Sequence, residues 1–160
     1  LAAQLPSDDP KLDRLMQIIQ QRLGAKGPGK VLLFSFYLRT LAYLQQQLQA
    51  TGYRVELVTG AVKDQERERL RARFRLPREH AEAIDILLSS EVGCEGLDYE
   101  FCDCLINYDI PWNPMRVEQR IGRIDRFGQE SDKVLIFNFQ SQNFIIFFIE
   151  SYSSTQLCLG

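Results

Sequence analysis

Two patterns of hydrophobic and polar positions alternate along the chain. Short apolar runs, typical of buried parallel strands, predict strands near 31–35, 53–58, 84–88, 105–108 and 134–139. Apolar residues at helical spacing predict helices over roughly 10–23, 38–52 and 64–76. Because strands alternate with helices, we expect an α/β fold, a doubly wound parallel sheet with right-handed crossovers and helices on its faces.

A further predicted helix carries a row of arginines. Arg116, Arg120 and Arg123 are spaced four and three residues apart, so a helix would place them on one face, with Arg126 one step further along. We expect this helix to extend through Arg126 and to stop at Gly128. Such a row either forms a solvated surface with acidic partners or binds phosphate, which a guanidinium group contacts through two hydrogen bonds at once.

Gly24–Lys30 has the spacing of a phosphate-binding loop, G-x-x-x-x-G-K, without the context that such a loop needs. A phosphate-binding loop follows a strand, opens a helix and has Ser or Thr after its lysine. Here Val31 follows the lysine, and a predicted strand comes next. We therefore expect a flexible connection between a helix and a strand.

The composition narrows the class of protein. The 160 residues suit one domain, and their net charge of −2 differs from the basic excess of proteins that bind nucleic acid unaided. The cysteines form no C-x-x-C pair and the one histidine, His80, stands apart from them, so we expect no metal site. Neither a signal peptide nor an apolar run of transmembrane length is visible, which favours a cytoplasmic protein.

Unusual loop chemistry follows the strand predicted at 84–88. Ligands of doubly wound sheets bind beyond the carboxyl ends of the strands. The segment Ser89–Asp98 lies there, with hydroxyls and glycines that suit a phosphate and with Asp98 as an acceptor for a ribose hydroxyl. The alternative is an ordinary loop in which Asp98 caps a helix.

The arginine helix has a clear start in the sequence. Asn113–Pro114 suits that start, and we expect the preceding Trp112 to pack on the domain.

The arginine row belongs to a longer match. Gln119-Arg120-x-Gly122-Arg123-x-x-Arg126 resembles motif VI of superfamily 2 helicases and translocases. The preceding Asp109-Ile-Pro-Trp-Asn-Pro114 and the following Arg126-Phe-Gly-Gln129 are similar to the Snf2 family, especially bacterial members related to the RNA-polymerase-recycling ATPase. Ser89–Asp98 resembles motif V, and the whole resemblance covers roughly residues 30–139.

The resemblance implies the second RecA-like lobe, the helicase C-terminal domain, of an ATP-dependent translocase. Arg123 and Arg126 would be its catalytic residues, as arginine fingers that reach the γ-phosphate of ATP. The implied ATP contacts come from motifs V and VI: Gly96, Asp98, Gln119, Arg120, Arg123 and Arg126. The implied nucleic-acid contacts are Ser35, Gly60, Ser89 and Ser90.

The sequence shows no credible phosphate loop and no Asp-Glu pair for magnesium, so ATP with Mg²⁺ would be held mainly by the first lobe of the same parent chain. The other implied partner is double-stranded DNA or a nucleoprotein complex. The alternative function is a non-catalytic doubly wound module that binds a nucleotide or a protein. Residues 1–29 would form a lead-in with a helix, 30–139 the lobe, and 140–160 a tail that is a sixth strand or a covering helix.

Overall fold

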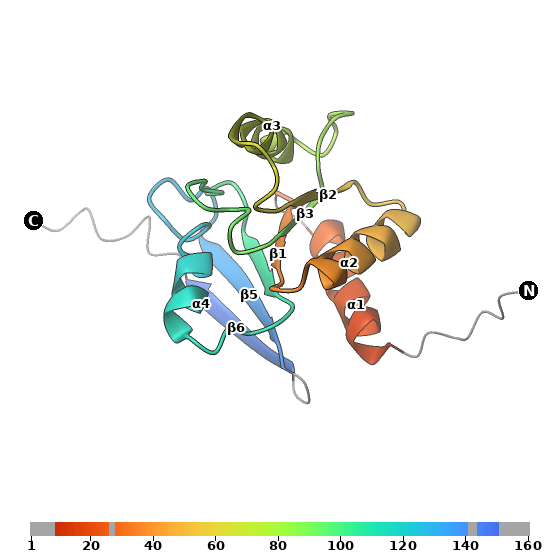
Figure 1. Ribbon diagram of the computed structural model, residues 1–160, viewed down its shortest axis with the longest axis vertical. Helices are drawn as coiled ribbons and strands as arrows, with labels where there is room; N and C mark the ends of the chain where they lie inside the picture. The colour runs from red at the N-terminus through yellow and green to blue at the C-terminus, as the bar shows by residue number, and fades with distance from the viewer. Residues whose placement is uncertain (1–8, 26–27, 141–143, 151–160) are drawn as a thin grey trace, which may run out of the picture.

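A single mixed sheet organises the molecule (Figure 1). The computed structural model describes residues 9–25, 28–140 and 144–150. The strand order across the sheet is β2-β3-β1-β4-β5-β6, and every neighbouring pair is parallel except β5 and β6. The strands are β1 (Val31–Phe34), β2 (Val55–Val58), β3 (Ile86–Ser89), β4 (Cys104–Asn107), β5 (Lys133–Phe139) and β6 (Phe144–Glu150). The predicted doubly wound parallel sheet is confirmed for β1 to β5.

The helices begin where their sequences offer capping groups. They are α1 (Pro10–Gly24), α2 (Leu38–Ala50), α3 (Asp64–Arg75) and α4 (Pro114–Ile121). The Asp9 carboxylate accepts a hydrogen bond from Leu12 N at 3.0 Å, and Asn113 Oδ1 accepts one from Met115 N at 3.0 Å, so both helices have a side-chain cap followed by proline. In α3, Asp64 suits a cap by residue type but is already the first helical residue, and Lys63 takes the N-cap position without a side-chain hydrogen bond.

Both faces of the sheet are covered, which explains the uninterrupted apolar runs of its strands. In β1, Val31 and Leu33 pack in a core cluster with α1 and α2, and Leu32 and Phe34 pack in a second cluster with α3 and the turn after α4. In Figure 1, α1 and α2 lie together on one side of the sheet and α3 and α4 lie apart from them. The helix of the predicted lead-in therefore shares the core of the sheet.

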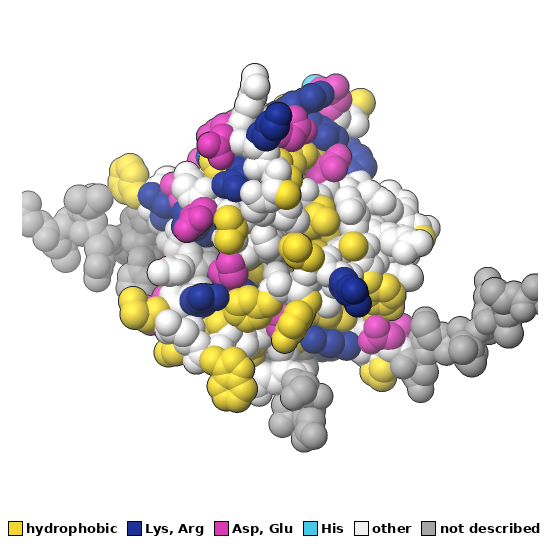
Figure 2. Space-filling view, viewed as in Figure 1, with side chains coloured by type: hydrophobic (Ala, Val, Ile, Leu, Met, Phe, Trp, Pro, Cys, Tyr) yellow, Lys and Arg dark blue, Asp and Glu magenta, His cyan; other side chains and the backbone are white. Residues whose placement is uncertain are grey.

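The arginines of α3 form ion pairs with neighbouring segments. Arg71 and Arg75 each lie 3.2 Å from Glu100, and Arg73 lies 3.0 Å from Glu56. Figure 2 shows basic and acidic side chains interspersed over this helix. In spite of its many arginines, α3 is thus an ion-paired helix, in keeping with the net charge of −2.

Two further expectations concern segments that the structure describes only in part. Gly24–Lys30 connects α1 to β1, with Gly29 at a φ of 62° and Lys30 buried, so it has the helix-to-strand order expected of a connection. In the tail, Phe144–Glu150 forms β6, the strand alternative, and pairs antiparallel with β5. The remaining tail residues, 141–143 and 151–160, lie outside the described part of the chain.

Candidate functional site

The loops with unusual chemistry meet at the carboxyl edge of the sheet, as expected for this fold. Strands β1, β3 and β4 end at Phe34, Ser89 and Asn107, and α4 begins shortly after β4. Arg120 connects these segments, because its guanidinium contacts Glu91 of the loop after β3 and Asp109 of the loop after β4. Residues far apart in sequence thus form one site.

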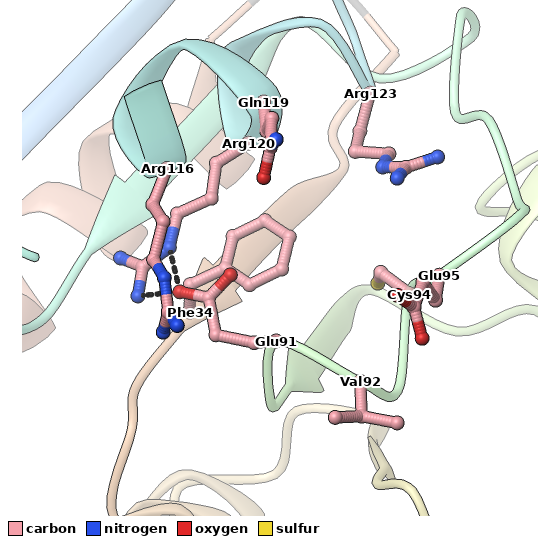
Figure 3. A pocket seen from close by; sticks show the side chains of 9 residues that line it. All are labelled: Phe34, Glu91, Val92, Cys94, Glu95, Arg116, Gln119, Arg120 and Arg123. Atoms are coloured by element: carbon pink, nitrogen blue, oxygen red, sulfur yellow. Dashed lines mark hydrogen bonds and ion pairs between the residues drawn. The ribbon is translucent and has the colours of Figure 1, made fainter. Parts of the chain in front are cut away.

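A cavity of about 250 Å³ opens between α4 and the loop after β3 (Figure 3). In Figure 3, side chains of α4 such as Arg116 and Arg120 lie on one wall, side chains of the loop such as Glu91 lie on the other, and Phe34 of β1 lies between them. The lining residues are Phe34, Glu91, Val92, Cys94, Glu95, Arg116, Gln119, Arg120 and Arg123. Cations and carboxylates therefore face the same space.

Arg120 is buried, with a residual exposure of 1%. Its Nε donates to Glu91 Oε1 at 2.6 Å, and its Nη1 donates to Asn107 Oδ1 at 2.9 Å and to the Asp109 carbonyl at 3.0 Å. Its Nη2 also lies 3.8 Å from Asp109 Oδ1. A solvated surface, one of the two alternatives for the arginine row, does not describe Arg120, because protein acceptors already surround most of its buried guanidinium.

The arginine helix is shorter than expected. Helix α4 ends at Ile121 with Gly122 as its C-cap, and Arg123 and Arg126 lie in the turns that follow. Arg123 N bonds back to Arg120 O at 3.1 Å, which tightens the last turn, and Arg123 O accepts from Tyr99 N at 2.7 Å. A continued helix would need that carbonyl for residue 127, so the contact with Tyr99 replaces the helical bond.

The two remaining motif VI arginines share one carboxylate. Arg123 Nη1 lies 3.7 Å from Asp98 Oδ1, and Arg126 Nη1 contacts the same oxygen. All three side chains keep contact with solvent, at 27% exposure for Arg123, 44% for Arg126 and 33% for Asp98. An incoming anion can therefore reach Arg123 and Arg126, as it can the exposed Arg116 on the cavity wall.

The six predicted ATP contacts fall around two neighbouring hollows. Gln119, Arg120 and Arg123 line the cavity of Figure 3, and Gly96, Asp98 and Arg126 line a second, more open one of about 400 Å³. The pair of Arg123 with Asp98 joins the two hollows. Gly96 has a φ of 78°, so glycine is required there by the backbone turn.

The predicted nucleic-acid contacts are mostly enclosed. Ser35 is buried and its hydroxyl donates to the Asp109 carboxylate, and Ser89 is buried and its hydroxyl donates to Ser90 O. Ser90 is 7% exposed and its hydroxyl accepts from Gly93 N, whereas Gly60 is exposed. Contacts through the Ser35 and Ser89 hydroxyls would require these internal hydrogen bonds to break.

Sequence reasoning missed the acidic partners of the site. Glu91 and Asp109 each follow a strand end at the same edge as the arginines, and this placement was the available signal. The prediction that Trp112 packs on the domain is also wrong, since that side chain is fully exposed. With Tyr37, Val92 and Met115, Trp112 adds exposed apolar surface to this edge.

The cysteine in the cavity is not poised for nucleophilic chemistry. Burial raises the pKa of the Cys94 thiol, whose sulfur lies 3.5 Å from the Tyr99 hydroxyl, so the thiol stays protonated at neutral pH. Over residues 9–25, 28–140 and 144–150 there is no cluster of three or more potential metal ligands. No helix in the same ranges is long and apolar enough to cross a bilayer.

Known proteins resemble this chain over most of its length. Residues 10–128 match the model of the family described as the helicase conserved C-terminal domain. A protein of Bacillus subtilis (strain 168), named "Uncharacterized ATP-dependent helicase YqhH", is 39% identical over 139 residues, which are 82% of this chain and 24% of that protein. RNA polymerase-associated protein RapA of Proteus mirabilis (strain HI4320) is 36% identical over 125 residues, 78% of this chain and 12% of that protein.

Solved structures show the same fold. The C-terminal part of the Fun30 ATPase domain aligns with a TM-score of 0.73 and 24% identity, over 84% of this chain and 42% of that one. The C-terminal domain of the DEAD-box protein Dbp5 aligns with a TM-score of 0.63 and 28% identity, over 82% of this chain and 71% of that one. The sheet is thus the RecA-like sheet of helicase C-terminal domains.

Proposed function

Because this chain belongs to the helicase conserved C-terminal domain family, we propose that it is the second RecA-like lobe of an ATP-driven translocase or helicase of the Snf2 type. The chain spans only 24% and 12% of the relatives described above, which leaves room for a first lobe in a parent chain. The nucleotide site would form between the two lobes. Its reaction is the hydrolysis of ATP, coupled to movement on nucleic acid.

The observation that carries this proposal is the pair of arginines that share Asp98. Arg123 and Arg126 are partly exposed at the carboxyl edge of the sheet, and both belong to the segment that resembles motif VI. In the assembled enzyme they would leave Asp98 and reach the γ-phosphate. A guanidinium there stabilises the charge that spreads over the phosphoryl oxygens in the transition state.

The other motif residues would support these fingers. Arg120, held by Glu91 and Asp109, would fix the end of α4 and hence the backbone from which Arg123 projects. Asp98, once released from the arginines, and Gly96 would face the ribose. Gln119 lines the same cavity as Arg123 and would contact the nucleotide directly.

ATP and Mg²⁺ fit a site completed by this lobe. This chain offers cations and a ribose acceptor at the site, while its described residues include no carboxylate cluster for the metal. The first lobe would therefore hold Mg²⁺, which supplies charge neutralisation at the phosphates. We also propose a cytoplasmic parent protein. The buried thiols Cys94, Cys102 and Cys104 form no disulfide, and the reducing cytoplasm keeps thiols in that state.

Nucleic acid would bind at the same edge, on loops that move with lobe closure. We propose double-stranded DNA or a nucleoprotein complex as the partner, with exposed Gly60 and nearly buried Ser90 as the first contacts. Ser35 and Ser89 would contribute after their loops open. Alternating closure of the two lobes would move the strand stepwise.

Hydrolysis by the isolated chain tests the two-lobe proposal. The purified 160-residue chain should show no ATP turnover and weak nucleotide binding, because the groups for Mg²⁺ and the phosphates are on the first lobe. A parent chain with both lobes is the positive control. Steady turnover by the isolated chain that persists through repurification would contradict the proposal and would favour a self-contained site.

A further inference from the structure

A second basic cavity lies at the opposite edge of the sheet from the arginine fingers. It has a volume of about 330 Å³, at the lower end of the range of ligand sites. Lys30, which precedes β1, lines it together with Arg75 from the end of α3 and Arg78 from the loop that follows. The lysine is the last residue of the G-x-x-x-x-G-K segment, for which the proposed function has no use.

Lys30 is a buried cation with little to neutralise it. Its exposure is 3%, and its Nζ donates one hydrogen bond, to the Ile84 carbonyl at 2.6 Å. Its ammonium lies 5.7 Å from the centre of the Phe74 ring, and no carboxylate in the described part of the chain comes within 4.0 Å of it. An ammonium has three N–H donors, so Lys30 retains donors for a further acceptor.

Arg78 adds a second donor that lacks an acceptor. Its Nε is buried without a hydrogen-bond partner among the described residues, although it lies 3.5 Å from Asp85 Oδ1. Its Nη1 donates to the Leu23 carbonyl, which fixes the side chain. Gly29 makes room for it, since a Cβ there would lie 2.4 Å from Arg78 Cδ.

The carboxylates around the cavity are engaged elsewhere or turned to solvent. Asp85 accepts from Arg54 Nε and Nη2 at 3.0 and 2.7 Å. Glu130, on the cavity wall, is 57% exposed and pairs with Arg75 at 3.3 Å, and Glu79 is also exposed. Of the residues that line the cavity, Lys30 is thus buried and the two glutamates are exposed, whereas the buried Asp85 is not a lining residue and pairs with Arg54 and Arg78.

We propose that this cavity binds a small anion of the phosphate class, inorganic phosphate or a phosphate monoester, with Lys30 and Arg78 as inner donors and Arg75 at the mouth. A phosphate presents several acceptor oxygens, which matches donors that approach from three segments of the chain. The cavity lies at the amino edge of the sheet, so the proposal does not depend on the nucleotide site.

The charge state of Lys30 gives the site a pH dependence. The pKa of Lys30 is lowered to about 8, mainly by burial; Arg54 and Arg78 contribute to this lowering, and Asp85 and Cys102 oppose it. Anion binding requires the charged form, so affinity should fall as the pH rises through 8. The pKa of the nearby Cys102 thiol is raised by burial to about 12, so that thiol stays neutral over the same range.

The test is a titration of the 160-residue chain with inorganic phosphate at constant ionic strength, followed by NMR and by thermal melting. We expect the Arg78 Nε–H resonance to shift and the melting temperature to rise with phosphate, both more at pH 7 than at pH 9. Lys30→Met should weaken phosphate binding by at least about tenfold, because a charged donor is lost. Lys63→Met, at an exposed position at the other end of α3, should bind phosphate like the unaltered chain.

A second variant keeps the proposal testable if Lys30→Met does not fold. Arg75→Gln changes a half-exposed side chain at the mouth and should weaken binding while the chain stays folded. The proposal is overturned if phosphate moves neither the Arg78 resonance nor the melting temperature beyond the effect of chloride. It is equally overturned if a folded Lys30→Met chain responds as the unaltered chain does, since the anion is then adventitious.

Discussion

The arginines of one short segment have three different environments. Arg116 is exposed, Arg120 is buried among protein acceptors, and Arg123 and Arg126 share the Asp98 carboxylate. Their shared function is a prediction from the resemblance to motif VI. The environments of these arginines could not be predicted, because Arg120 donates to Glu91, 29 residues away in sequence, and Arg123 donates to the Leu97 carbonyl, 26 residues away.

Arg120 offers a residue-scale prediction. Arg120→Met should lower the free energy of unfolding by about 3 kcal/mol, because Glu91 and Asp109 would lose their shared buried partner. Arg116→Met is the matched control, and an exposed position should change stability by less than about 0.5 kcal/mol. Urea denaturation of the three chains measures both values. Equal midpoints for the two variants would contradict the positioning role of Arg120.

The elements themselves were largely predictable, and their ends less so. Strands buried on both faces have continuous apolar runs, so each of β1 to β5 was found in the sequence within a few residues of its bounds. The end of α4 was missed, because it depends on the contact between Arg123 O and Tyr99 N, which sequence spacing does not reveal. The burial of the Ser35 and Ser89 hydroxyls was also missed, because their hydrogen bonds depend on the folded loops and sequence spacing does not reveal them.

The loop after β3 provides the prediction at the scale of elements. A Cβ on Gly93 would lie 2.3 Å from the Val58 carbonyl oxygen, so this glycine lets the loop pack on the end of β2. Gly93→Ala should therefore destabilise the chain by roughly 1–3 kcal/mol, through forced backbone shifts. Gly24→Ala, at the end of α1 with open space around it, should be neutral or slightly stabilising. Thermal melts that rank the two variants in the opposite order would refute this packing.

At the scale of the whole molecule, the chain has the charge and the site of a lobe that works with a partner. Its net charge is −2, and its α3 arginines are paired internally, so it offers little sequence-independent attraction to nucleic acid. Arg123 and Arg126, which are partly exposed to solvent, converge on one carboxylate at one edge of the sheet. This arrangement suits a nucleotide held by a second lobe across that edge.

The central claim is that Arg123 and Arg126 are arginine fingers, and the nucleic-acid-stimulated ATPase rate of a two-lobe parent chain tests it most directly. Arg123→Ala and Arg126→Ala should each lower that rate by orders of magnitude, up to about 10³- to 10⁵-fold, with little change in nucleotide affinity or melting temperature. Arg→Lys at either position should restore little, because an ammonium lacks the planar fork. Arg116→Ala, as the control, should stay near the unaltered rate. Near-normal rates for both Arg123→Ala and Arg126→Ala would contradict the account.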